Sequence, residues 1–599
     1  MWRCAAGNSF WLHQWRWRFL KHSRQYTDYI GGKFSLTSHS LPSRASIPQV
    51  VEIGSGKISG RSMPVDEGRF VNVFMGIPYA KPPVGILRFQ EPQPADRWNG
   101  VRNCLRHSPK APQKELLIER FIANRVASSE DCLYLNIFAP AWPPPHQQPN
   151  GFPVMVFIHG GAFAVHSSSF YGDIGICRSL CAKDIIVVTI QYRLGILGFA
   201  ATGDRSCIAN LGLRDQTFAL QWIKKNIWVF KGDPDNITIA GQSAGGVCVD
   251  LLMLSPYSQD LFSKAIAISG TAECAWAMND IRKVCKALRF HALKIGWKCP
   301  ADANENAVNL SMMEFLKGKK ASELSLGVRS LRKRKDNIYG IDFAPVVDGD
   351  FFPAPINELR RTAPKKTCMT GTTEFEGLFF ASYRERRYNE KAIDSLISEF
   401  IKSGDEEIKK KALALYPTEG KSKKEIVRTY MRLYSDISVN NGVHAFAEQM
   451  VNAGHTVYLY NFQYHPQTFG AIGWAFPFID ATHGTDLPYL FGKPIFTGAK
   501  FNANDFKMLD QYTKLITNFV KNGSPNEAGQ LEWQPLTIED TWRYYNIHLT
   551  SSMQADFQER RPAFWHALEG IPPESESATG SQDLNSPNSR QVPQQLSSN

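Results

Sequence analysis

A serine near the middle of the chain stands where the sequence predicts a sharp turn. It belongs to Gly241-Gln242-Ser243-Ala244-Gly245, which lies between the β-branched run 237–240 and the helix-competent stretch 246–253. The order strand, tight turn, helix lifts a serine hydroxyl out of a sheet, and the glycines allow the backbone to bend sharply. We therefore predict that Ser243 is a nucleophile. Because this short pattern also arises by chance, other residues must support the prediction.

A nucleophilic serine needs a base to take its proton and an acid to hold that base in the correct tautomer. Glu376 follows the predicted strand Thr367–Thr370, and His483 lies between two aromatic-rich segments. A single histidine among 14 is more often structural, and a glutamate in a turn is usually only solvated. Their order in the chain and their settings together favour Ser243, Glu376 and His483 as a catalytic triad.

A glycine turn offers hydrogen-bond donors for this chemistry. Residues 159–163, His-Gly-Gly-Ala-Phe, directly follow the predicted strand Val154–Ile158. The backbone N–H groups of Gly160, Gly161 and Ala244 are our candidates for stabilising the oxyanion that forms when a serine attacks a carbonyl group. One such donor is typically worth about a hundred- to a thousandfold in rate. We interpret the histidine of this segment as a structural residue.

The elements that must hold these residues alternate between strands and helices. The runs Val154–Ile158 and Ile185–Ile190 are short and apolar throughout, which is typical of strands buried on both faces of a parallel sheet. Residues 213–227 predict a helix, and further strands are predicted at 265–268, 367–370 and 456–460. The chain is therefore predicted to have the α/β fold class, with a large, mostly parallel central sheet flanked by helices.

Composition excludes several classes of protein. The 599 residues are 43% hydrophobic, without an apolar run near the roughly 18 residues that a membrane-spanning helix needs. The net charge is +12, but the densest basic cluster, 332–335, is isolated and lacks aromatic neighbours, so we expect a solvated loop and no nucleic-acid partner. Eleven cysteines are too few for a disulfide scaffold, and the sequence has no zinc-type cysteine and histidine spacing. We predict no metal site.

Both ends of the chain differ from its middle. Residues 1–46 are basic and rich in Trp and Arg, without the apolar stretch of a secretory signal. We interpret them as a disordered extension, a mitochondrial transit peptide or a start-site error. Residues 571–599 are polar and are predicted to be disordered. A single domain is expected over 47–570.

Several further segments resemble those of one family. They are Gly76-Ile77-Pro78-Tyr79-Ala80, Ser129-Glu130-Asp131-Cys132, Gln191-Tyr192-Arg193-Leu194-Gly195, residues 210–216 and Val347-Asp348-Gly349. From about residue 50 to 567 the chain resembles the type-B carboxylesterases, the cholinesterase-like branch of the α/β-hydrolases. The resemblance implies an α/β-hydrolase fold with insertions over the C-terminal edge of the sheet. It also implies hydrolysis of a small carboxylic ester through an acyl-enzyme, a glutamate as the acid of the triad, and no cofactor.

The expected substrate differs from that of the cholinesterases. Ile122 stands where those enzymes carry a tryptophan that binds a quaternary ammonium group, and an aliphatic side chain has no ring face to offer. We therefore do not expect acetylcholine as the substrate, although Phe121 could substitute for the missing ring. Trp276 matches a position that lines the family's acyl pocket, and Phe163 and Phe379 are candidates for apolar walls or for core packing. Such a pocket favours esters with hydrophobic parts.

Cysteine usage bears on the cellular compartment. Ala111 stands where secreted family members have the partner of Cys132, which is left free unless it pairs with Cys104. Cys274 and Cys299 match the family's second pair and are predicted to be either a disulfide or two buried thiols. A free thiol favours a reducing environment, so we expect an intracellular, cytoplasmic protein, with mitochondria as the alternative. A non-catalytic adhesion relative and an interfacial lipase are the rival hypotheses.

Overall fold

The computed structural model describes residues 49–66, 68–114, 126–327, 339–384, 388–401, 405–465, 476–494 and 500–568, without the side chains of 382–384. The chain divides into two compact units, Met1–Ile47 and Pro48–Asn599, and every described residue belongs to the second. The expectations for 1–46, for the basic cluster 332–335, for 571–599 and for Phe121 and Ile122 lie outside the described residues.

A 13-stranded sheet forms the centre of the molecule, in the order β1-β2-β3-β5-β7-β6-β8-β9-β10-β11-β12-β13, with β4 beside β2. The strands β7 (Ile186–Ile190), β6 (Phe152–Ile158), β8 (Gly232–Gln242), β9 (Lys264–Ile268), β10 (Thr367–Thr373), β11 (Thr456–Phe462) and β12 (Tyr544–Ile547) run parallel to their neighbours in this order. Every predicted strand overlaps one of them, which confirms the predicted fold class.

Antiparallel strands extend the sheet at both ends. β1 (Gln49–Ile53), β2 (Gly56–Asp66), β3 (Arg69–Pro78) and β5 (Tyr134–Pro140) pair antiparallel in succession up to β7, and β13 (Ser552–Gln554) pairs antiparallel with β12. β4 (Val101–Asn103) is parallel to β2. The sheet is therefore mixed, with the predicted parallel arrangement through its centre.

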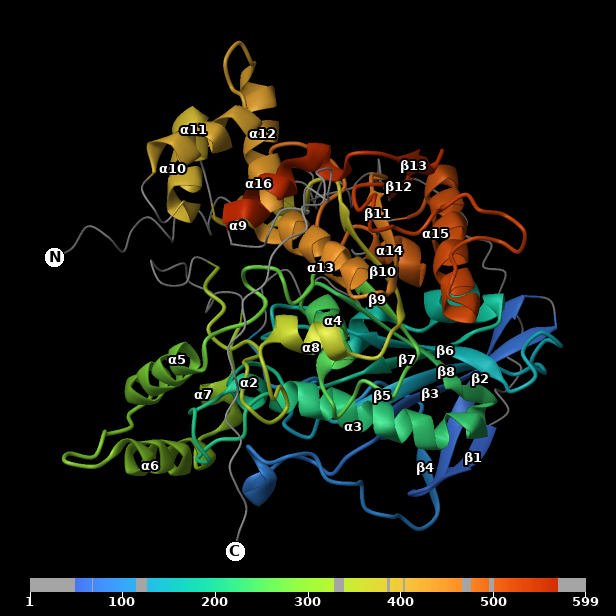
Figure 1. Cartoon of the computed structure of the whole chain (residues 1–599). Coiled ribbons are helices and arrows are strands. Elements are labelled where there is room, and N and C mark those ends of the chain that lie inside the picture. Colours follow the sequence, from blue (N-terminus) through green and yellow to red (C-terminus); the bar gives the residue numbers. More distant parts are fainter. Residues whose placement is uncertain are drawn as a thin grey trace, which may run out of the picture. The chain divides into compact units, whose positions relative to one another are not determined.

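Side chains of one strand alternate between the two faces of the sheet, so each face has its own hydrophobic core. On β6, Val154, Val156 and Ile158 belong to one core and Met155 and Phe157 to the other. Helices α3 (Leu211–Asn226) and α4 (Ala244–Leu254) contribute to the first core, and α15 (Ala503–Asn522) to the second. Figure 1 shows helices on both sides of the strands.

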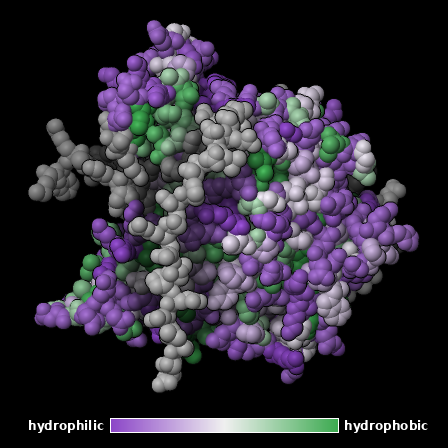
Figure 2. Space-filling model, viewed as in Figure 1, coloured by the Kyte–Doolittle hydropathy of each residue, from purple (hydrophilic) through white to green (hydrophobic). Residues whose placement is uncertain are grey.

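Among the described residues, the other α-helices are α2 (Gly195–Phe199), α5 (Ile281–Lys294), α6 (Glu305–Lys317), α7 (Ala321–Leu324), α8 (Ile356–Thr362), α9 (Glu376–Arg384), α10 (Glu390–Phe400), α11 (Glu406–Leu415), α12 (Lys423–Ser435), α13 (Asn441–Asn452), α14 (Leu487–Phe491) and α16 (Arg561–Leu568). Residues of α9 to α12 pack into a third, smaller core together with Trp565 of α16. The part of the chain that the structure describes has no helix that could cross a bilayer. The face drawn in Figure 2 is mostly hydrophilic, with small separate hydrophobic patches.

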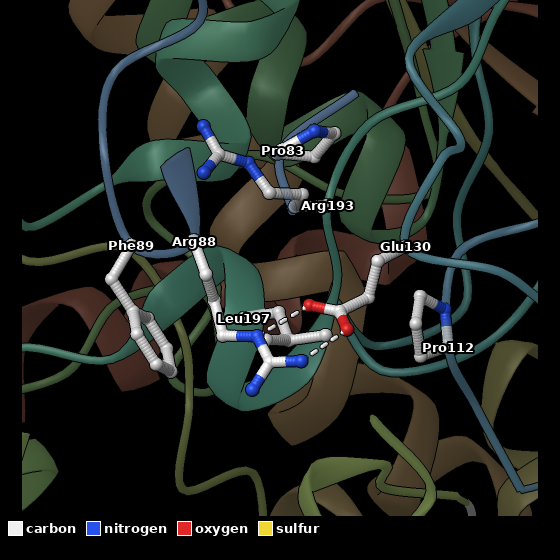
Figure 3. A pocket seen from close by; sticks show the side chains of 7 residues that line it. All are labelled: Pro83, Arg88, Phe89, Pro112, Glu130, Arg193 and Leu197. Carbon is white, nitrogen blue, oxygen red and sulfur yellow. Dashed lines mark hydrogen bonds and ion pairs between the residues drawn. The ribbon is translucent and has the colours of Figure 1, made fainter. Parts of the chain in front are cut away.

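Buried ion pairs explain several of the segments that resemble the family. The guanidinium of Arg193 makes two hydrogen bonds with Asp215, at 2.8 and 2.7 Å, and both side chains are buried. Glu130 pairs with Arg88 through two hydrogen bonds, one of them 2.7 Å long, in the pocket of Figure 3. Because none of the predicted catalytic residues lines this pocket, we interpret the Arg88 pair as structural.

A buried network also ties the helix after Ser243 to distant parts of the chain. Asp250 on α4 accepts hydrogen bonds from Arg360 of α8, at 2.6 and 3.1 Å, and from the backbone N–H of Ala272, at 2.8 Å. Arg360 also pairs with Glu273 at 2.8 Å. Because Asp250 and Arg360 are both almost fully buried, each charge depends on the other for compensation.

We expect Asp250→Ala to destabilise the protein by about 3–5 kcal/mol, because the substitution leaves the Arg360 guanidinium buried without its main partner. Chemical denaturation measures this loss. The control is Asp235→Ala, which removes an exposed partner of Lys224 and should cost no more than about 1 kcal/mol. Equal stabilities of the two variants would contradict the role given to the buried pair.

Candidate active site

Ser243 occupies the turn between β8 and α4, as the sequence predicts. Its φ of 60° and ψ of −128° are rare for a residue with a side chain, and such strain is typical of functional sites. The turn depends on close packing, because a Cβ atom on Gly245 would lie 2.1 Å from the carbonyl oxygen of Ile158 on β6. The Ser243 backbone is fixed by its N–H, which donates to Ile268 of β9 at 2.8 Å.

The predicted oxyanion donors come from two elements. Ala244 is the first residue of α4, so its N–H has no acceptor within the helix. Among the described residues, the N–H groups of Gly160 and Gly161 donate to no backbone carbonyl outside the helices and strands, and the N–H of Gly160 forms a hydrogen bond with the hydroxyl of Tyr171. Gly161 has a φ of +107°, and a Cβ atom there would lie 2.2 Å from the carbonyl oxygen of Val165, so this turn requires glycine. A Cβ atom on Gly160 would lie 2.9 Å from that of Ser243, which puts the two segments in contact.

Glu376 is fully buried, and three donors surround its carboxylate. The strand β10 continues to Thr373, and Glu376 is the first residue of α9 rather than a turn residue as predicted. Oε1 accepts hydrogen bonds from Ser269 Oγ at 2.6 Å and from the N–H of Thr373 at 2.7 Å. Oε2 lies 2.6 Å from Nδ1 of His483. The structure therefore brings the predicted acid and the predicted base together.

The hydrogen bonds of His483 define its tautomer. Because Nδ1 must donate to the Glu376 carboxylate, Nε2 of the neutral ring carries the lone pair. The side-chain Nε2 of Gln242 lies 3.1 Å from this atom, so the amide donates to it. Among the described residues no hydrogen bond joins Ser243 to His483, although Gln242 is the direct neighbour of Ser243 in the chain. The lone pair of the predicted base is therefore occupied by an amide N–H.

Four aromatic side chains either lie close to His483 or belong to the predicted pocket. Phe163 and Trp276 are buried with their ring centroids 6.4 Å apart, and the Trp276 indole N–H donates to Ser438 at 2.7 Å. Phe379 is half-buried, and its ring centroid lies 6.2 Å from that of His483. Phe380, which was not predicted, is closer to His483, at 4.6 Å.

His159 has the structural role that the sequence suggested. Its ring stacks on Tyr192 with centroids 4.5 Å apart, and Nδ1 lies 2.9 Å from the carbonyl oxygen of Gly160. Burial lowers the pKa of His159 to about 3, with a smaller contribution from the charge of His166. The ring therefore stays neutral beside the glycine turn.

All the cysteines that the structure describes are free thiols, so neither Cys104 and Cys132 nor Cys274 and Cys299 form a pair. Cys299 is exposed, which makes the prediction of two buried thiols wrong at this position. Cys274 is buried, and burial raises the pKa of its thiol to about 12. Buried thiols of this kind are chemically inert.

Sequence reasoning missed two polar residues beside this site. Ser269 directly follows β9, and a search of strand ends for hydroxyl groups would have found it. Asp486 lies three residues after His483, is fully buried and has no hydrogen-bond partner for Oδ1 among the described residues. Burial raises the pKa of Asp486 to about 7, and the nearby charge of Glu376 acts in the same direction.

The model of the carboxylesterase family matches residues 47–565. The chain is 36% identical to esterase cest-33 of Caenorhabditis elegans over 84% of its length and 90% of that protein. It is 32% identical to the medium-chain fatty acyl-CoA hydrolase precursor of Anas platyrhynchos, over 88% of the chain and 93% of that protein. It is also 32% identical to human neuroligin-2, over 83% of the chain and 64% of that protein.

We expect Asp486→Asn to stabilise the protein at pH 8 but not at pH 4. The folded state keeps a proton on Asp486 up to about pH 7, whereas the unfolded chain releases it near its ordinary pKa of about 3.8, so wild-type stability falls as the pH rises between these values. Asparagine cannot ionise and removes this loss. Melting temperatures of both proteins across this range measure the effect, and parallel curves would contradict it.

Proposed function

The chain belongs to the carboxylesterase family and is a carboxylic ester hydrolase, and we propose that it cleaves its substrate through an acyl-enzyme on Ser243. The observation that carries this proposal is the hydrogen bond between His483 and the buried Glu376 carboxylate, which leaves the other ring nitrogen as a base. The strained turn that holds Ser243 also supports it, because a raised hydroxyl is what an attacking serine needs.

In the first half of the reaction, Ser243 Oγ attacks the ester carbonyl while its proton moves to Nε2 of His483. The Nδ1–H group of His483 keeps its hydrogen bond to Glu376, whose negative charge stabilises the imidazolium. The backbone N–H groups of Gly160, Gly161 and Ala244 stabilise the oxyanion of the tetrahedral intermediate. His483 then gives the proton to the departing alcohol, which leaves the acyl group on Ser243.

In the second half, water attacks the acyl-enzyme, and His483 again takes a proton and returns it to Ser243. The products are a carboxylic acid and the free serine. Gln242 takes part only as a positioning residue. Its amide N–H occupies the lone pair of His483 in the resting site, so it must release that atom before Ser243 can transfer its proton.

We infer that the substrate is a small ester with a hydrophobic part. The rings of Phe379 and Phe380 lie close to His483, and Phe163, which ends the glycine segment 159–163, forms a buried aromatic pair with Trp276. A relative named as a medium-chain fatty acyl-CoA hydrolase supports an aliphatic acyl group. The argument from Ile122 against acetylcholine remains a prediction.

We also propose an intracellular location, in the cytoplasm or, alternatively, in mitochondria through residues 1–46. The free thiols throughout the described residues support a reducing compartment. The mature N-terminus, read by mass spectrometry, distinguishes the two locations.

Substitution of Ser243 tests its role as the nucleophile. We expect Ser243→Ala to lower kcat on p-nitrophenyl esters by about a millionfold and to abolish labelling by a fluorophosphonate probe. The control, Ser552→Ala, changes an exposed serine on β13 and should behave as the wild type. Labelling that persists in Ser243→Ala would contradict the assignment of the nucleophile. A wild-type protein that neither turns over esters nor reacts with the probe would instead favour a non-catalytic role, as in the adhesion branch of the family.

Varying the length of the ester chain tests the substrate class in the same assay. We expect turnover of dissolved short- and medium-chain esters to exceed that of emulsified lipid. The reverse order would favour the interfacial lipase hypothesis.

Substitution of Gly161 tests the role of the oxyanion turn. We expect Gly161→Ala to lower kcat by about a hundred- to a thousandfold, because the new Cβ atom displaces the turn and its N–H groups. Gly529→Ala is the matched control, since Gly529 also has a positive φ but open space around it. A melting temperature near that of the wild type shows that the variant is folded. An unchanged kcat in folded Gly161→Ala would remove these N–H groups from the mechanism.

A further inference from the structure

Three side chains that can bind a metal ion meet between the helices α13 and α16. His444 and Glu448 lie one helical turn apart on α13, and His566 lies on α16, which packs against α13 (Figure 1). One ligand atom from each of the three lies within 4.8 Å of the others. None of the three belongs to the triad or to the oxyanion turn.

Backbone carbonyls fix the tautomers of both imidazoles. Nε2 of His444 lies 3.1 Å from the carbonyl oxygen of Thr541, and Nε2 of His566 lies 3.0 Å from that of Asn441. Since a carbonyl oxygen only accepts hydrogen bonds, each Nε2 must carry a proton. In the neutral rings both Nδ1 atoms therefore carry lone pairs. Metal-binding histidines are oriented in the same way, with the second nitrogen donating to a carbonyl or carboxylate.

The two Nδ1 atoms differ in their surroundings. Nδ1 of His444 is buried and has no hydrogen-bond partner among the described residues. Nδ1 of His566 lies 3.7 Å from Oε2 of Glu448, whose side chain is only 12% exposed. Two imidazoles and one carboxylate therefore meet in a largely buried place between α13 and α16.

We propose that His444, Glu448 and His566 bind one zinc ion that joins α13 to α16. Two imidazole nitrogens and one carboxylate oxygen form a ligand set that suits zinc, with one position left for a fourth ligand. The aromatic ring of Trp542 stacks on His444 with centroids 3.8 Å apart and shields the site from one side.

The ion would act on stability rather than on the ester. Arg561, at the start of α16, already pairs with the buried Asp436 at 2.6 Å, so this helix is anchored at one end by charge. The zinc ion would anchor its other end, at His566. The prediction of no metal site came from the lack of closely spaced cysteines and histidines in the sequence. These three ligands instead lie on two helices that are far apart in the sequence.

Zinc binding is tested on the full-length protein after treatment with EDTA and dialysis against zinc. We expect about one zinc ion per chain by elemental analysis, and a melting temperature that rises by about 2 °C or more in excess zinc. Cobalt in place of zinc should give visible absorption bands of a tetrahedral site. Wild-type protein that retains no zinc and shows no shift would overturn the proposal.

Variants assign the ligands. Glu448→Gln and His566→Gln should each lose at least about tenfold in zinc affinity. The controls are His146→Asn, which changes an exposed histidine, and Cys299→Ser, which removes the exposed thiol. Both controls should bind zinc as the wild type does. Binding that is unchanged in Glu448→Gln and His566→Gln, or that is lost in Cys299→Ser, would place the ion elsewhere and overturn the proposal. Labelling of Ser243 by a fluorophosphonate is measured separately and does not depend on this result.

Discussion

The buried carboxylate of Glu376 constrains the rest of the site. With no exposure to water, its negative charge must be compensated by donors of the protein, and these come from a residue after β9, from the end of β10 and from His483. If any one of these three segments shifted, a buried charge would lose a partner. The fold therefore holds His483, the base that we propose, in one orientation before any substrate arrives.

Parallel strands make this arrangement possible, because their carboxyl ends meet at one edge of the sheet. β6 ends directly before the glycine turn, β8 directly before Ser243 and β9 directly before Ser269, and two residues separate the end of β10 from the start of α9. The strain at Ser243 is offset by the close packing around it, where even a Cβ atom on Gly245 would collide with β6. Large cores on both faces of the sheet keep these strand ends in register.

The sequence was sufficient for the parts of the fold that follow simple periodicity. Apolar runs located the central strands, and the glycines around Ser243 located the turn. The N-terminal strands escaped prediction because β2 contains Gly60 and Pro64, which are unfavourable in strands, and is irregular next to Pro64. The contact between Gln242 and His483 depends on side-chain direction across two distant segments, which no spacing reveals. The exposure of Cys299 depends likewise on how its loop packs.

The residues of the site are far apart in the sequence, and this has a consequence for folding. The Ser243 turn meets His483, through the contact of Gln242 with His483, only when β8, β10 and the segment after β11 are all in place, and α16 must dock before Asp436 can pair with Arg561. During synthesis on the ribosome, Ser243 therefore emerges long before His483, the base that we propose for it. A truncated or misfolded chain would carry the proposed nucleophile without that base. Reaction of this serine would then report that nearly the whole domain has reached its native state.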